Sequence, residues 1–228
     1  MATVILVRHG RTTANATGML AGRTAGIKLD PTGHRQADST GERLAVVPLA
    51  AVVSSPLERC RQTTRAIVKR QSGTPSVPIE RGIIECDYGD WQGKPLAELA
   101  KEDLWATVQA QPSAVTFPGG ESMATMQARS VAAIRAHDAV IEAQHGKNAV
   151  WAAVSHGDII KSILADALGM HLDLFQRINV NPASVSIVRY GSGRTDVVSM
   201  NTDAGDLSWL AASEAPKDAA VGGGAGHP

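Results

Sequence analysis

The chain has 228 residues, a length that suits one domain with a substantial core. Its 22 basic and 22 acidic residues cancel, so it lacks the basic surplus typical of proteins that bind nucleic acid or anionic membranes, and we expect a small-molecule partner. No apolar run approaches about 18 residues and no charged start precedes an apolar stretch, so we expect a cytoplasmic protein without membrane spans.

Short β-rich runs alternate with helical patterns in the first half of the chain. In chain order we predict a strand at residues 3–7, a helix at 31–45, a strand at 50–53, a helix at 56–70 and a short extended stretch from Ile79. The start of the first helix is clearly marked, because Asp30 can cap it and Pro31 suits its first position. This alternation is typical of a parallel α/β sheet.

The second half continues the alternation and ends in a hairpin. We predict one or two short helices in 95–111, a long helix at 121–144, a strand at 149–154, a helix at 158–168, and paired strands at 183–190 and 195–200. On the long helix Met123, Ile134 and Ile141 share one face, which indicates core packing. The predicted fold is therefore a three-layer α/β/α sandwich with a mostly parallel central sheet and at least one antiparallel strand.

The composition changes near residue 213. We assign residues 1–212 to one domain and expect 213–228 to be a disordered tail, because this segment is rich in Ala, Gly, Pro and charge. Two cysteines, Cys60 and Cys86, are too few for a disulfide framework or a four-ligand zinc site, so we expect reduced, buried thiols. The alternative is that both lie near one pocket and respond together to oxidation.

Two predicted strands end directly in a histidine followed by a glycine. His9-Gly10 follows the first strand and His156-Gly157 follows the strand at 149–154. Ligands of open parallel sheets bind outside the carboxyl ends of the strands, so we expect both imidazoles to face one pocket, with the glycines allowing the backbone to approach a ligand. A single histidine is more often structural, but two in matching contexts favour a functional site.

Two arginines are expected near these histidines. Arg59 falls in the first turn of the helix at 56–70, where a cation opposes the helix dipole unless an anion lies between them. A surface ion pair with Glu58 is the alternative explanation. With Arg8 beside His9, the sheet edge holds two guanidiniums and two imidazoles, a set that suits a phosphoryl group.

These residues belong to motifs that occur together in one known family. RHG followed by Asn15, SSPLERCRQT, ECDYGDWQG, PGGES and SHG occur in the order seen in the histidine phosphatase superfamily. Over residues 3–190 the chain resembles the branch of cofactor-dependent phosphoglycerate mutases and broad-range phosphatases, and within it actinobacterial probable phosphomutases. The resemblance implies that His9 is the phosphorylated nucleophile and Glu85 the proton donor, with phosphoryl oxygens bound by Arg8, Asn15, Arg59, His156 and Gly157.

Physical chemistry agrees with these implied roles. His9 must be neutral to attack, and a hydrogen bond from Nδ1 to a backbone carbonyl would leave Nε2 as the nucleophile. Phosphoryl transfer needs charge stabilisation more than covalent chemistry, and arginine supplies it, so we expect neither metal nor cofactor. Spacing alone does not choose the proton donor among Glu85, Asp87 and Asp90, and the family pattern selects Glu85.

The chain departs from the common family pattern at three positions. Arg11, Ala14 and Gln92 stand where an acidic residue, an aromatic residue and glutamate are usual, and Arg23 and Thr24 lie in a loop that could line the substrate end. These departures leave the substrate unidentified.

A phosphatase is favoured over a mutase because the second phosphate has few cationic partners. Cys86 stands where mutases carry arginine, and residues 111–121 contain no Lys or Arg. The mutase alternative depends on Lys94, Lys101, Arg11 or Arg23. Two other classes are a non-catalytic phospholigand-binding module and a two-histidine metal site, and a homodimer is left open. Repulsion by adjacent arginines argues against the metal site.

Overall fold

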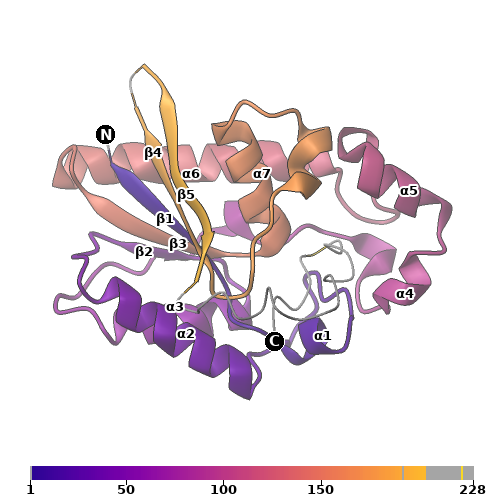
Figure 1. The fold of residues 1–228 in the computed structure, drawn as a ribbon, viewed down its shortest axis with the longest axis horizontal. Coiled ribbons are helices and arrows are strands. Elements are labelled where there is room, and N and C mark those ends of the chain that lie inside the picture. Colours follow the sequence, from indigo (N-terminus) through magenta and orange to yellow (C-terminus); the bar gives the residue numbers. More distant parts are fainter. Residues whose placement is uncertain (1, 192, 204–221, 223–228) are drawn as a thin grey trace, which may run out of the picture.

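The computed structural model describes residues 2–191, 193–203 and 222, and its centre is a five-stranded sheet (Figure 1). The strands are β1 (Thr3–Arg8), β2 (Val52–Ser54), β3 (Val150–Ser155), β4 (Val185–Tyr190) and β5 (Thr195–Thr202), in the order β2-β3-β1-β4-β5. Strands β2, β3 and β1 are parallel, β4 is antiparallel to β1, and β5 is antiparallel to β4. The predicted, mostly parallel sheet with an antiparallel strand is confirmed.

Helices cover both faces of this sheet. The longer ones are α2 (Pro31–Leu44), α3 (Glu58–Val68), α6 (Met123–His145) and α7 (Gly157–Ala167). The shorter ones are α1 (Thr13–Ala16), α4 (Leu96–Leu99), α5 (Asp103–Ala110) and the 3₁₀ turns η1 (Arg81–Ile83), η2 (Gly89–Trp91), η3 (Pro112–Ala114) and η4 (Leu172–Arg177). Apolar residues of α2 and α3 pack on one face of the sheet and those of α6 and α7 on the other. These are the three predicted layers.

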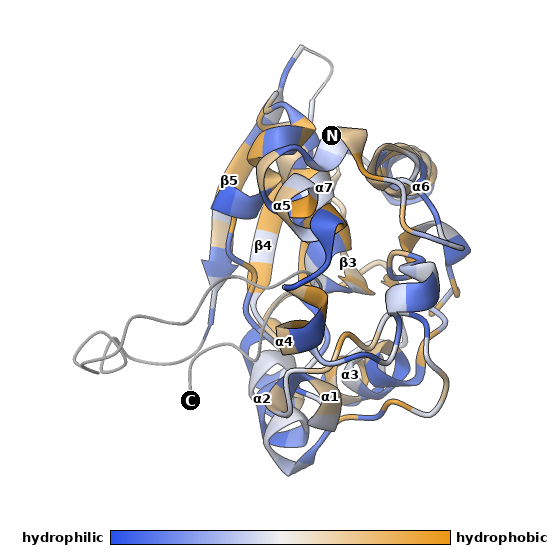
Figure 2. Cartoon of the chain, turned by 90° about the vertical axis from the view of Figure 1, so that its right-hand side faces the viewer, coloured by the Kyte–Doolittle hydropathy of each residue, from blue (hydrophilic) through white to orange (hydrophobic). Residues whose placement is uncertain are grey.

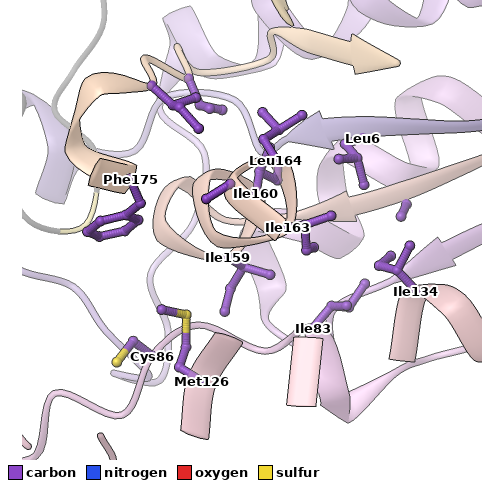
Figure 3. Packing of buried hydrophobic residues seen from close by; sticks show 14 of the residues in the cluster. Leu6, Ile83, Cys86, Met126, Ile134, Ile159, Ile160, Ile163, Leu164 and Phe175 are labelled. Atoms are coloured by element: carbon purple, nitrogen blue, oxygen red, sulfur yellow. The ribbon is translucent and has the colours of Figure 1, made fainter. Parts of the chain in front are cut away.

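The two cores follow from the alternation of side chains along a strand. In β1, Val4 and Leu6 join the cluster with α6 and α7, whereas Ile5 and Val7 join the cluster with α2 and α3. Helix α7 is buried on every side from Gly157 to Ala165, and Figure 3 shows its isoleucines spread around the helix axis. In Figure 2, strand β4 is mostly hydrophobic, whereas helix α2 carries many hydrophilic residues.

Local signals account for the ends of the long helices. Asp30 caps α2 by accepting a hydrogen bond from Gly33 N at 2.7 Å. Helix α6 begins at Met123, two residues later than predicted, because Ser122 is its N-cap and accepts from Thr125 N at 3.1 Å. The predicted core face of α6 is confirmed, since Met123, Ile134 and Ile141 are buried.

Some expectations differ from the structure. Ile79 makes only an isolated bridge to Ser54, because the chain turns into η1, where the Glu80 side chain accepts from Gly82 N at 2.6 Å. Helix α1 and the turn η4 carry no strong periodic signal and were not predicted. The expected tail lies outside the described residues except for Gly222. Among the described residues, no helix is long and apolar enough to cross a membrane.

Candidate active site

The two histidines leave the sheet side by side. Strands β1 and β3 are parallel neighbours, and Arg8 pairs with Ser155, so His9 and His156 follow directly at the same edge. Their ring centroids are 5.3 Å apart and both side chains are buried. The imidazoles therefore meet where the strand pattern predicts.

His9 is held as a neutral imidazole whose Nε2 is the accepting nitrogen. Its Nδ1 lies 2.8 Å from Gly10 O and donates to it, while Arg59 Nε donates to His9 Nε2 at 3.2 Å. Burial, and then the charges of Arg59 and Arg8, hold the pKa of His9 well below its ordinary value of 6.5. A neutral ring with an accepting Nε2 is the form that can act as a nucleophile.

His156 is fixed in the opposite tautomer. Arg59 Nη2 lies 3.2 Å from His156 Nδ1 and can only donate, so Nδ1 accepts and Nε2 donates to Ser55 Oγ at 2.8 Å. Burial, and then Arg59, hold the pKa of His156 well below 6.5. Arg59 thus bridges the two imidazoles.

Arg59 is a buried cation, and one of its hydrogen-bond donors has no partner among the described residues. It occupies the first turn of α3, is 2% exposed, and also donates from Nη2 to Gly22 O at 2.7 Å. Its Nη1 has no hydrogen-bond partner among the described residues, and leaving a buried donor unpaired costs about 1–3 kcal/mol. The alternative pairing with Glu58 is wrong, because Glu58 contacts Arg65 at the surface at 3.3 Å. An anion would satisfy Nη1.

Three more groups from the predicted set point to anion binding. Arg8 is 1% exposed and donates to Val180 O at 2.8 Å; burial lowers its pKa to about 10, which leaves it charged at neutral pH. The Asn15 Oδ1 accepts from Thr12 N at 3.0 Å and Thr12 Oγ1 at 2.8 Å, which leaves the amide NH₂ to offer to a ligand. Gly157 is the first residue of α7, where helical N–H groups favour anions.

Glu85 is the carboxyl group of the site. It is 3% exposed, its Oε1 accepts from Cys86 N at 2.9 Å, and its Oε2 lies 3.8 Å from His156 Nδ1. Burial, and then the negative charge of Asp158, raise its pKa to about 7 against the opposing charge of Arg59. Glu85 can therefore give or take a proton near neutral pH.

Asp87 and Asp90, the other two candidates for the proton donor, are not part of the described cavity lining. Asp87 Oδ2 pairs with Arg23 Nη1 at 3.0 Å, and Asp90 is exposed. Of the three carboxylates that spacing left open, Glu85 is the one in the described lining of the cavity with His9 and Arg59.

A small cavity collects these groups. In the described part of the chain it is lined by His9, Thr12, Asn15, Met19, Leu20, Ala21, Gly22, Arg59, Glu85, Leu96 and Gly222. It holds about 20 Å³, room for little more than one water, so a ligand has to displace part of the lining. A larger hollow of about 870 Å³ includes Thr3, Lys147 and Arg189 but none of the groups above. The smaller cavity is the candidate site because of the chemical groups that line it, although its volume is the smaller of the two.

A network that the sequence analysis missed holds the backbone of Glu85. Arg129 donates to Gly82 O at 2.7 Å, Ile84 O at 2.8 Å and Glu85 O at 3.2 Å, and Arg23 Nε donates to Glu85 O at 2.9 Å. Glu121 joins the two arginines, accepting from Arg129 at 2.6 and 2.9 Å and from Arg23 at 2.9 Å. Arg23, Glu85 and Glu121 or Arg129 are far apart in the sequence, so no local sequence pattern predicts the network.

Replacing Glu121 by glutamine tests how firmly this network is built. Glu121 is mostly buried, and although burial opposes it, the hydrogen bonds from Arg129 and Asp87 N lower its pKa. Losing its charge leaves two arginines poorly paired, so we expect the free energy of unfolding in urea to fall by about 1–3 kcal/mol. Glu98→Gln, at an exposed position of α4, is the control and should change it by less than about 0.5 kcal/mol. Equal effects of the two substitutions would contradict a structural role for the network.

The three positions that depart from the family pattern have defined surroundings in the structure. Arg11 Nε pairs with Asp30 at 2.8 Å, Ala14 is buried, and Gln92 Oε1 accepts from Arg23 N at 2.5 Å. Arg11 and Arg23 are therefore both held by acidic groups. Lys94 and Lys101 are exposed. Arg59 is the one arginine in the described lining of the cavity, which includes no lysine.

Gly10 has a different role from the predicted one. A Cβ at this position would lie 2.3 Å from Gly33 O, at the start of α2. The missing side chain makes room for the protein backbone of α2, and its expected role in letting the backbone approach a ligand stays a prediction.

The two thiols are buried and belong to different cores. Cys60 packs with α2 and α3 and its Sγ lies 3.4 Å from His156 Nε2, whereas Cys86 lies in the other cluster, in the same part as Met126 (Figure 3). Both are free. Burial raises the pKa of Cys60 to about 12 and raises that of Cys86 still further.

We therefore expect neither thiol to react in the folded protein at pH 7.5, because the thiolate is the reactive form. Mass spectrometry after iodoacetamide treatment should find both unmodified without denaturant and both alkylated in urea. Rapid alkylation of either thiol in the native protein would contradict this placement.

Residues 4–203 match the family model described as histidine phosphatase superfamily, branch 1. The chain belongs to the histidine phosphatase superfamily. The resemblance expected from the motifs is confirmed over nearly the whole described chain.

Relatives within the superfamily include phosphatases and mutases. The chain is 32% identical over 170 residues to a 2,3-bisphosphoglycerate-dependent phosphoglycerate mutase of Gloeobacter violaceus, covering 73% of this chain and 75% of that protein. It is 29% identical over 208 residues to phosphoserine phosphatase 1 of Hydrogenobacter thermophilus, covering 88% and 92%. The fold is shared with Bacillus stearothermophilus YhfR, with a TM-score of 0.79 at 24% identity, covering 88% of this chain and 97% of that one.

Other relatives are longer than the region they share with this chain. A bifunctional protein of Mycobacterium tuberculosis is 31% identical over 205 residues, which cover 87% of this chain and 53% of that protein. The chain thus spans about half the length of this mycobacterial relative.

Proposed function

We propose that this histidine phosphatase is a phosphomonoesterase that acts on a small phosphorylated metabolite through a phosphohistidine intermediate. The observation that carries the proposal is the arrangement of Arg59 between two neutral imidazoles. One buried donor of Arg59 is unpaired within the described part of the chain, and Glu85 lines the same cavity. The relatives named as phosphatases support it.

In the first half of the reaction, the phosphoryl group moves to His9. The lone pair of Nε2 attacks phosphorus in line with the ester oxygen, the Nε2–P bond forms and the P–O ester bond breaks. Arg8 and Arg59 stabilise the charge on the equatorial oxygens. The leaving oxygen takes the proton of Glu85, whose pKa of about 7 keeps a large fraction protonated near neutrality.

In the second half, water regenerates the enzyme. Glu85, now ionised, accepts a proton from the water, whose oxygen attacks phosphorus as the Nε2–P bond breaks. The Nδ1–H bond to Gly10 O keeps the ring oriented throughout. We propose that the two guanidiniums supply the charge that a metal provides in other phosphatases, so hydrolysis should continue after thorough chelation.

The experiment is a comparison of two activities on one preparation. Phosphate release from p-nitrophenyl phosphate and from a panel of phosphomonoesters is measured with and without EDTA. The interconversion of 3- and 2-phosphoglycerate is measured with and without 2,3-bisphosphoglycerate. We expect chelator-resistant hydrolysis and weak interconversion, because the described lining of the cavity includes one arginine, Arg59, and no lysine, so a second phosphate would find few cationic partners.

A phosphoglycerate mutase-type phosphomutase is the second candidate, favoured by the Gloeobacter relative. Bisphosphate-dependent interconversion that runs orders of magnitude faster than hydrolysis would establish it. Binding of phosphorylated ligands with no turnover of any substrate would establish the non-catalytic alternative.

A further inference from the structure

The segment that carries Glu85 has no regular secondary structure. It runs between the turns η1 and η2, and among the described residues the carbonyl groups of residues 82–85 accept no hydrogen bond from the backbone. Backbone carbonyls that are removed from water need donors, and the path of such a segment depends on where those donors lie.

The side chain of Arg129, on α6, supplies most of these donors. Its Nη1 donates to Gly82 O at 2.7 Å and to Ile84 O at 2.8 Å. Its Nη2 donates to Glu85 O at 3.2 Å. One guanidinium therefore holds three carbonyl groups of the segment.

Two further contacts fix the same segment against the sheet and α6. Ser155, the last residue of β3, donates from Oγ to Ile83 O at 2.8 Å. A Cβ at Gly82 would lie only 2.5 Å from Ala133 Cβ, so η1 lies close against α6. The segment therefore has little freedom to shift while Arg129 is in place.

The guanidinium of Arg129 is itself held in one orientation. Glu121 accepts from Arg129 Nε at 2.9 Å and from Nη2 at 2.6 Å, a bidentate pairing that matches the planar fork of arginine. An ammonium is a point charge with three donors and no such fork. Lysine at position 129 would keep the charge but not the five hydrogen bonds that Arg129 makes.

The carboxyl group of Glu85 depends on the backbone that Arg129 holds. Within the described part of the chain, its one hydrogen bond is from the N–H of Cys86 to Oε1 at 2.9 Å, while Oε2 lies 3.8 Å from His156 Nδ1, too far for a hydrogen bond. The N–H of Cys86 and Glu85 O belong to the same planar peptide group. Arg129 and Arg23 both donate to that oxygen, so they fix the peptide that holds the carboxyl group.

We propose that Arg129 is a positioning residue for the proton transfer. By fixing the peptide between Glu85 and Cys86, it holds the Glu85 carboxyl group where it gives its proton to the ester oxygen as the P–O bond breaks. The inference rests on the proposed phosphomonoesterase function and adds to it a residue that acts through Glu85. A misplacement of about 1 Å can cost about 10²-fold in rate, and here the cost falls on substrates that need the proton.

Two esters with different leaving groups test the proposal. β-Glycerol phosphate releases an alkoxide, which needs the proton, whereas p-nitrophenyl phosphate releases a weakly basic phenolate. For each full-length enzyme, kcat/KM is measured for both esters and the ratio of alkyl to p-nitrophenyl ester is taken, so a general loss of activity cancels. In Arg129→Lys we expect this ratio to fall by about tenfold or more.

Arg135→Lys is the matched control, and Arg23→Lys is a second test. Arg135 lies on the same helix and pairs with Asp166 at 2.7 Å, but at an exposed position, so its ratio should stay within about twofold of wild type. Arg23 is 29% exposed and donates to the same Glu85 oxygen at 2.9 Å. In Arg23→Lys the ratio should fall by about threefold or more.

A double substitution separates positioning from stability. Glu85→Gln has no proton to give, so adding Arg129→Lys to it should leave the ratio within about twofold of Glu85→Gln alone. A structural role would instead lower activity in either background without this dependence on Glu85. Hydrolysis of p-nitrophenyl phosphate that depends on His9 tests the phosphatase function independently of the ratio.

Two results would overturn the assignment. One is a folded Arg129→Lys enzyme with an unchanged ratio or, if that variant does not fold, an unchanged ratio in Arg23→Lys. The other is a fall in the ratio caused by Arg129→Lys that persists at full size in the Glu85→Gln background.

Discussion

Replacing His9 by alanine is expected to lower kcat/KM for phosphomonoester hydrolysis by at least about 10⁴-fold, or about 5.5 kcal/mol of transition-state stabilisation. His9 lines the described cavity, and its Nε2 accepts a hydrogen bond only from Arg59 among the described residues. His156 is not part of the described cavity lining, and its Nε2 donates to Ser55, so we do not expect it to replace His9. The substitution removes the attacking atom and leaves the anion-binding groups in place.

The matched control is His34→Ala, at an exposed position of α2, which should leave kcat/KM within about threefold of wild type. Urea denaturation of both variants shows whether each is folded. A folded His9→Ala protein with wild-type hydrolysis of p-nitrophenyl phosphate would exclude His9 as the nucleophile.

Replacing Glu85 by glutamine is expected to have an effect that depends on the leaving group. Alkyl phosphates need protonation of the departing oxygen, so their kcat/KM should fall by about 10²–10⁴-fold, whereas p-nitrophenyl phosphate should lose about tenfold or less. Burial, and then Asp158, raise the pKa of Glu85 to about 7, so the acid form is present below that pH. In the wild type, kcat/KM for alkyl phosphates should therefore fall above pH 7. In Glu85→Gln, this fall above pH 7 should be absent.

Asp90→Asn is the control, since Asp90 is a nearby but exposed carboxylate. Its kcat/KM for alkyl phosphates should stay within about threefold of wild type. Equal losses for alkyl and p-nitrophenyl esters in Glu85→Gln, or a larger loss in Asp90→Asn, would assign the proton donor elsewhere.

The sequence predicted those parts of the site that depend on local patterns. His9 and His156 follow apolar strands directly, and in a parallel sheet the ends of neighbouring strands share an edge, so their meeting could be foreseen. Arg59 was noticed because a cation in the first turn of a helix is unfavourable without an anion. Its position between the imidazoles confirms that it faces the site.

Contacts between distant segments could not be predicted in the same way. Arg129 reaches Glu85 O from a helix 44 residues further along the chain, and nothing in either segment indicates this contact. Gly10 is explained by the closeness of Gly33, which depends on how α2 packs.

The most direct test of the mechanism is to trap the intermediate. The enzyme is mixed with ³²P-labelled substrate, quenched within milliseconds in base, and analysed by mass spectrometry of its peptides. We predict phosphate on His9 that is stable in base and labile in acid, and none in the His9→Ala protein. Phosphate found on a serine, threonine or cysteine near the site, such as Ser55, Thr63 or Cys60, would contradict the phosphohistidine mechanism.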